Sequence, residues 1–150
     1  MPITFDTDPQ RLDRETIYRF LSQESYWARD LPRAIFERSL AGSLCFGGYD
    51  DAGTQVAFAR VVTDRATFGY LADVFVHADW RGQGIGKALV RFILDYPELQ
   101  DLRRFMLATA DAHSLYAGYG FTPLSAPDRL MERLDQGVYR RLAAQASTAS

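Results

Sequence analysis

The spacing of apolar residues is helical over the first forty positions and strand-like over the next forty. Ile17, Phe20 and Leu21 fall on one face and predict a helix that ends near Leu21. Pro32 and Gly42 bound a second predicted helix, because proline suits a first helical turn and glycine a helix end. Four segments predict strands, at residues 3–6, 44–50, 54–64 and 67–77. The connections between the last three are short enough for hairpins and predict consecutive antiparallel strands.

The pattern returns to helical spacing after Gly86. One buried face would hold Ile85, Ala88, Leu89, Phe92, Ile93 and Tyr96, and Pro97 would end the helix. A strand over 103–109, a short helix over 111–120 and two last strands over 120–124 and 130–134 complete the prediction. The order predicts an α+β or mixed α/β fold with one sheet, in a single domain over residues 1–140. The small polar residues of 141–150 predict a frayed tail.

Composition narrows the class of protein further. The 150 residues are 47% hydrophobic and 24% charged, which suits one domain with a packed core. The net charge is −2 and the basic residues are dispersed, so we expect no nucleic-acid surface. The single cysteine, Cys45, excludes an internal disulfide and a cysteine-based zinc site, and we expect no metal. We see no signal peptide and no apolar run long enough for a membrane span, so we expect a cytoplasmic protein that binds no membrane.

The segment RGQGIGK, residues 81–87, connects a predicted strand to a predicted helix. The first N–H groups of a helix have no partner inside it, and glycines let a backbone approach a ligand closely. With Arg81 and Lys87 adding charge, the segment predicts an anion site, most naturally for phosphate. It does not match a P-loop, because residue 81 is arginine and residue 88 is alanine. It does not match a dinucleotide fingerprint either, because its glycine spacing is G-x-G-x-G.

The spacing that fits is [QR]-x-x-G-x-[GA], which Arg81, Gly84 and Gly86 satisfy. This resembles the acyl-CoA loop of the GNAT family of N-acetyltransferases. A second motif agrees, because Tyr116, Gly120 and Phe121 match the Y-x-x-x-G-F pattern of that family. The resemblance extends from residue 3 to about residue 134. It implies the GNAT fold, a central, mostly antiparallel twisted sheet of about 6–7 strands flanked by about 4 helices.

The resemblance also implies which residues bind acetyl-CoA, the expected cosubstrate. Backbone N–H groups of the loop would hold the pyrophosphate, and main-chain atoms of the preceding strand would pair with the pantetheine arm, as an added strand does. The residues assigned to CoA in this way are Val74, Phe75, Val76, Arg81, Gly82, Gln83, Gly84, Ile85, Gly86 and Lys87.

By the same resemblance, Tyr116 would protonate the departing thiolate. The alternative is a packing aromatic. The general base stays open, because Ala72 occupies the position where many family members carry a glutamate. Asp73 is one candidate, although an alternating strand would point it away from the face of Ala72 unless a bulge intervenes. His113 is another, three residues before Tyr116 on the same predicted helix. Water can also serve, and either side chain could have a purely structural role.

The expected function is transfer of an acetyl group to a primary amine of a small molecule, amino acid or peptide, by direct attack in a ternary complex. Tyr26 and Trp27 would bind the acceptor or else fill the core. The alternatives are a non-catalytic acyl-CoA-binding or regulatory module and a protein-lysine acetyltransferase. Sheet edges at the two last predicted strands would allow a homodimer.

Overall fold

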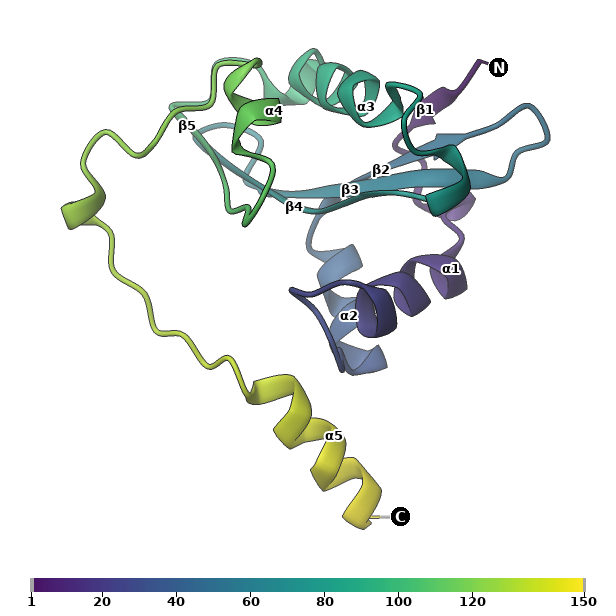
Figure 1. Cartoon of the computed structure of the whole chain (residues 1–150). Coiled ribbons are helices and arrows are strands. Elements are labelled where there is room, and N and C mark those ends of the chain that lie inside the picture. The colour runs from purple at the N-terminus through teal and green to yellow at the C-terminus, as the bar shows by residue number, and fades with distance from the viewer. Residues whose placement is uncertain (1, 150) are drawn as a thin grey trace. The chain divides into compact units, whose positions relative to one another are not determined.

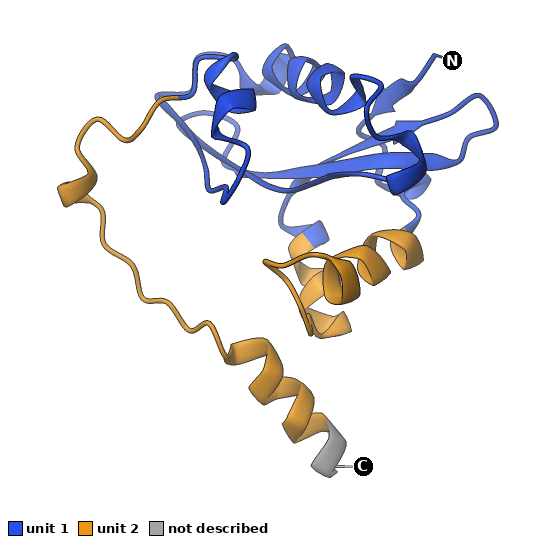
Figure 2. Cartoon of the chain, in the orientation of Figure 1, with its two compact units in different colours: residues 1–13, 40–121 blue, residues 14–39, 122–150 orange. Residues whose placement is uncertain are grey.

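The computed structural model describes residues 2–149 as two compact units, residues 1–13 with 40–121 and residues 14–39 with 122–150 (Figure 2). The first unit is built on one five-stranded sheet. Its strands run in the order β1 (Thr4–Asp6), β2 (Leu44–Tyr49), β3 (Gln55–Thr63), β4 (Phe68–Val76) and β5 (Arg104–Leu107). The strands β1 to β4 pair with one another in antiparallel fashion, and β5 runs parallel to β4. The predicted α+β class and the three consecutive antiparallel strands are confirmed.

Local sequence explains the two hairpins. In the turn between β2 and β3, the Asp50 carboxylate accepts hydrogen bonds from the N–H groups of Ala52 and Thr54, both at 2.9 Å. In the turn between β3 and β4, Asp64 accepts hydrogen bonds from the N–H groups of three following residues and from the Thr67 hydroxyl. Short acidic side chains stabilise tight turns in this way, by bonding to the backbone two or three residues on.

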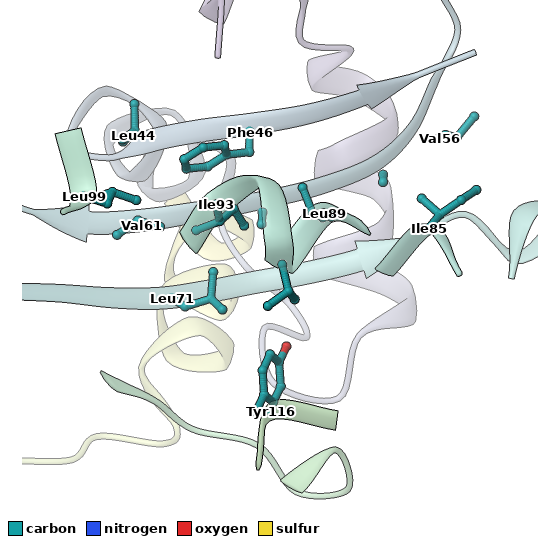
Figure 3. Close-up of a cluster of buried hydrophobic side chains, with 13 residues drawn as sticks. Leu44, Phe46, Val56, Val61, Leu71, Ile85, Leu89, Ile93, Leu99 and Tyr116 are labelled. Atoms are coloured by element: carbon teal, nitrogen blue, oxygen red, sulfur yellow. The ribbon is translucent and has the colours of Figure 1, made fainter. Parts of the chain in front are cut away.

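Helix α3 (Ile85–Leu94) packs against β3 and β4 on one face of the sheet (Figure 1). Its buried side chains recur at helical spacing, namely Ile85, Leu89, Val90 and Ile93. They join residues of β2, β3 and β4 in a single buried cluster (Figure 3). The apolar periodicity after Gly86 therefore identified the helix that covers this face. The prediction that Ala88 lies on the buried face is wrong, because Ala88 is exposed and Val90 is buried instead. The short helix α4 (His113–Ala117) contributes Tyr116 to the same cluster.

The second unit contains helices α1 (Arg14–Arg19), α2 (Arg33–Ala41, whose last two residues fall in the first unit) and α5 (Val138–Ala149). A π-helical turn, Phe20–Glu24, extends α1. Small polar residues predict a frayed tail over 141–150, whereas the structure assigns helix to residues 138–149. Helix is compatible with this composition, because alanine, glutamine, leucine and arginine all favour it. Whether this end frays, and whether residues 1–140 fold as one domain, stay predictions.

The prediction of two last strands, at 120–124 and 130–134, is wrong. These residues form turns and irregular chain, with one 3₁₀ turn at Pro127–Arg129. The sheet therefore has five strands in the described part of the chain instead of about 6–7. Pro123 and Pro127 interrupt the segment and lack the N–H group that strand pairing needs. Met131 and Leu134 are 97% and 64% exposed, so their apolar character did not correspond to burial.

No helix among residues 2–149 combines the length and the apolar composition that crossing a bilayer requires.

Candidate active site

The glycine-rich connection forms an open loop at the start of α3. Gly82 and Gly84 have φ angles of 78° and 82°, and a Cβ atom at either position would meet no described atom within 4 Å. Gly84 directly precedes α3 and has no side chain that could cap the helix. The neighbouring Gln83 is exposed. The first N–H groups of a helix lack intrahelical partners and lie at the positive end of its dipole. The loop therefore offers backbone donors and open space to an anion.

Side chains on both sides of the loop fix its position. Arg81 is exposed, and its Nε donates a hydrogen bond to the Val76 carbonyl oxygen, 3.0 Å away at the end of β4. Lys87 is exposed on the first turn of α3, and its carbonyl oxygen accepts a hydrogen bond from the Tyr119 hydroxyl at 3.1 Å. Ile85, between them, is buried in the core. The loop is held at both ends, while the two basic side chains stay accessible to solvent.

Strands β4 and β5 pair over only part of their length. The pairing ends at Leu71 and Leu107, while β4 continues to Val76 with β3 on its other side. Within the described residues, the second half of β4 therefore has no neighbouring strand on the β5 side. This half carries the residues predicted to pair with CoA, Val74, Phe75 and Val76. A Cβ atom on Gly86 would lie 3.8 Å from Val76 Cγ2, so α3 begins beside this unpaired edge.

Strand β4 contains a β-bulge at Asp73. Arg60 of β3 pairs with Ala72, whereas Phe58 pairs with Phe75, so β4 carries one extra residue in this stretch. Asp73 has a φ angle of 57°, in the left-handed region that side chains other than glycine, asparagine and aspartate rarely adopt. Its Oδ2 accepts a hydrogen bond from Arg60 Nε at 2.6 Å.

The bulge changes the face of the sheet that Asp73 reaches. Paired residues of adjacent strands share a face, so the ion pair with Arg60 places the Asp73 carboxylate on the face of Ala72. Regular alternation, which predicts the opposite face, is wrong here because the extra residue breaks the two-residue period. The Asp73 side chain is 9% exposed and that of Arg60 20%. Protonating Asp73 would leave a largely buried guanidinium without its counter-charge, which argues against Asp73 as the general base.

Arg60 is the residue that sequence reasoning did not select. It is a charged residue inside the apolar run VAFARVV of a strand, and the residues that precede it in β3 are buried. A charge in such a run needs a partner, and that signal could have drawn attention to it. The identity of the partner depends on the register between two strands.

The two candidate groups of α4 differ in exposure. Tyr116 is 8% exposed and packs edge-to-face on Phe121, with ring centroids 5.9 Å apart. Figure 3 shows its ring in the buried cluster. Val74 and Val76 are partly buried side chains that pack against the same cluster. His113 lies one turn earlier on the same helix and is exposed. One buried cluster therefore includes Tyr116 and has two residues of the unpaired half of β4 in its surroundings.

Tyr26 and Trp27 belong to the second unit. Their side chains are 60% and 41% exposed, and their rings meet edge-to-face with centroids 5.0 Å apart. Trp27 also contacts Phe20, at 6.0 Å between centroids. The alternative that both side chains fill the core is therefore wrong, since a large part of each is open to solvent.

Known proteins resemble the chain at the level of both sequence and structure. Residues 11–121 match the model of the acetyltransferase (GNAT) family. A Gibberella zeae protein described as an acetyltransferase is 33% identical, with 73% of each chain covered. A crystal structure from Xanthomonas campestris pv. campestris, of a protein assigned to the GNAT family, is 54% identical with a TM-score of 0.89; the match covers 93% of this chain and 98% of that one.

A crystal structure from Deinococcus radiodurans matches with a TM-score of 0.69 at 22% identity, and the match covers 94% of this chain and 92% of that one. This second similarity bears on the fold alone. The predicted GNAT fold is confirmed by the match to the Xanthomonas campestris structure. The family model spans most of the sheet, the glycine-rich loop and Tyr116. The chain therefore belongs to the GNAT family of acetyltransferases and is an acyltransferase.

Proposed function

We propose that the protein is an acetyl-CoA-dependent N-acetyltransferase that acts on a primary amine of a small molecule, amino acid or peptide, by direct attack in a ternary complex. GNAT acetyltransferases use acetyl-CoA and act on acceptor substrates. The observation that carries the proposal is the separation of β4 from β5 after Leu71, directly beside the open glycine-rich loop. The loop suits a pyrophosphate and the unpaired strand edge suits an extended arm, so the residues present fit this cosubstrate.

The chain would hold acetyl-CoA mainly through its backbone. N–H groups from Gly82 to Lys87 would bind the pyrophosphate, with Arg81 and Lys87 contributing positive charge. Main-chain atoms of Val74, Phe75 and Val76 would pair with the pantetheine arm. Bound acetyl-CoA supplies the acetyl group as a thioester. A backbone N–H of the bulged strand would stabilise negative charge on the thioester oxygen.

Proton transfer would fall to α4. Tyr116 would donate the proton that the departing thiolate sulfur requires, and its contact with the cluster beside β4 supports this role. Imidazole accepts protons near neutral pH, so we propose the exposed His113 as the base ahead of the ion-paired Asp73. Tyr26 and Trp27 would bind the acceptor, and their exposed aromatic faces support binding of a cationic amine.

Thiol release with acetyl-CoA and a panel of amino acids, polyamines, aminoglycosides and peptides tests the proposal, with each active acceptor repeated on Tyr116→Phe. We expect turnover with one acceptor class and a loss of kcat in the variant while acetyl-CoA affinity is retained. Acetyl-CoA binding without turnover on any acceptor would favour the regulatory module. Turnover confined to lysine side chains of folded proteins would favour the protein-lysine acetyltransferase. Absence of acetyl-CoA binding would refute the proposal.

We also propose that the chain forms a homodimer through residues 122–137. Four apolar side chains of this segment are 40% or more exposed, Leu124, Leu130, Met131 and Leu134, and exposed apolar groups gathered in one segment are typical of interaction sites. Among residues 2–149, strand β5 pairs on one side only, so its edge could receive a segment from a second copy. Light scattering tests this: we expect a dimer for the wild type and a monomer for Met131→Glu/Leu134→Glu. A wild-type monomer would refute it.

A further inference from the structure

The bulge in β4 lies where the proposed site needs a defined backbone. Pairing with β5 ends at Leu71, and Asp73 follows two residues later with its φ angle of 57°. The three strand residues assigned to CoA, Val74, Phe75 and Val76, come directly after it. A left-handed residue inside a strand redirects the backbone groups that follow, so the conformation of Asp73 determines where the next N–H and C=O groups point.

A network of polar contacts surrounds this bulge. Arg60 Nε donates to Asp73 Oδ2 at 2.6 Å, and Arg60 Nη1 donates to Ser43 Oγ at 3.2 Å. Arg60 thereby connects the residue before β2, the middle of β3 and the bulge of β4. Charge-assisted hydrogen bonds of largely buried groups are strong, and their geometry is restrictive. By contrast, the side chains of Arg65 and Glu98, another ion pair of the first unit, are 52% and 49% exposed and join two surface segments.

We propose that Arg60 is a positioning residue: by holding the Asp73 carboxylate it fixes the bulge, and the bulge fixes the backbone edge of β4 that receives acetyl-CoA. The inference rests on the proposed function and deepens it. Asp73 is then required for its shape and its acceptor oxygen, because aspartate tolerates a left-handed backbone better than most residues and can accept from Arg60. The role of Asp73 as a proton acceptor in catalysis is excluded by this proposal.

Substitutions at Asp73 separate the two roles. Asparagine tolerates the left-handed backbone and keeps an oxygen acceptor for Arg60, glycine keeps only the backbone freedom, and alanine keeps neither. We expect kcat/KM for acetyl-CoA to fall in the order wild type, Asp73→Asn, Asp73→Gly, Asp73→Ala. Alanine should lose roughly 10- to 100-fold, the effect of a small misplacement of substrate. The acidic limb of the pH–rate profile should remain in Asp73→Asn. An equal, large loss in all three variants, with that limb absent from the residual activity of Asp73→Asn, would identify a general base and overturn the proposal.

Substitutions at Arg60 test the other partner. We expect Arg60→Met to raise KM for acetyl-CoA and lower kcat, and Arg60→Lys to recover part of both. Arg65→Met is the matched control, because Arg65 also forms an ion pair but lies in the turn between β3 and β4. Circular dichroism would establish that each variant is folded. Wild-type kinetics in a folded Arg60→Met variant would overturn the proposal while leaving the proposed function intact.

A measurement without substrate keeps the inference testable if the proposed function fails. We expect backbone amides of residues 74–76 and of their β3 partners to exchange hydrogen roughly tenfold or more faster in Arg60→Met than in the wild type, because local opening becomes easier. Arg65→Met should leave these rates unchanged. Unchanged exchange in Arg60→Met would show that Arg60 does not hold the bulge. Absence of acetyl-CoA turnover and binding in the wild type would refute the proposed function alone.

Discussion

Replacing either of two glycines, two residues apart, with alanine should have opposite effects on stability. Gly84 has φ 82° and ψ 10°, and an added Cβ would meet no described atom within 4 Å. The cost of Gly84→Ala is therefore conformational, and a left-handed backbone costs an L-residue about 1–2 kcal/mol. Gly86 lies inside α3, and its added Cβ would make an ordinary contact with Val76 at 3.8 Å. Alanine exceeds glycine in helix propensity by up to about 1 kcal/mol.

We therefore expect Gly84→Ala to lower the free energy of unfolding by about 1–2 kcal/mol, and Gly86→Ala to leave it unchanged or raise it by up to about 1 kcal/mol. Urea denaturation followed by circular dichroism measures both, and equal m-values would establish that the denatured states are comparable. Gly84→Ala as stable as the wild type would refute the argument, since it would mean that the loop does not require the positive φ angle.

Acetyl-CoA binding should distinguish the same two glycines. The motif [QR]-x-x-G-x-[GA] allows alanine at position 86 but only glycine at position 84. A Cβ atom on Gly84 would enter the open space beside the loop, where the N–H groups of residues 82–87 would hold the pyrophosphate. We therefore expect calorimetry to give weaker acetyl-CoA binding for Gly84→Ala and unchanged binding for Gly86→Ala, which serves as the control. Wild-type affinity in a folded Gly84→Ala variant would refute the assignment of the loop to the pyrophosphate.

Three further predictions concern the first unit. Burial raises the pKa of Tyr49 to about 12, so folding favours its neutral form, and the free energy of unfolding should fall by about 1.4 kcal/mol per pH unit from pH 10 to 12. Urea denaturation across that range should show no such fall for Tyr49→Phe, and an equal fall in both proteins would contradict the prediction. In Gly47→Ala the new Cβ would lie 2.6 Å from Tyr49 Cζ, in a residue that is 1% exposed, so we expect the free energy of unfolding to fall by about 1–3 kcal/mol. The same substitution should cost less in a Tyr49→Ala background, and equal costs in the two backgrounds would exclude the clash. Hydrogen bonds from the Thr67 hydroxyl and from backbone N–H groups hold the pKa of Asp64 well below its usual range, so this carboxylate stabilises the fold above about pH 4 and loses the effect as pH falls. The melting temperature of Asp64→Asn should therefore depend less on pH in the acid range than that of the wild type, and an unchanged dependence would contradict this.

The sequence by itself determined the elements whose signals are local. The helix α3 follows from apolar residues at helical spacing, the hairpins follow from short acidic turns, and the loop at residues 81–87 follows from its glycines and flanking charges. Two motifs at fixed spacing were enough to indicate the GNAT family, because both lie within single segments of the chain. The same local reasoning failed at residues 120–134, where apolar residues suggested strands although no neighbouring strand is present in the described structure to pair with them.

Only the tertiary structure decided where β4 leaves β5 and which side chain faces which across the sheet. The register set by the hairpin at Asp64 holds as far as Arg60 and Ala72 and then shifts by one residue. That shift places Asp73 on the face of Arg60, where this candidate base forms an ion pair with the guanidinium. Arg60 and Asp73 are 13 positions apart in the sequence, and no motif links them. Their contact depends on strand register and on a single left-handed residue, and neither is encoded in the spacing of apolar positions.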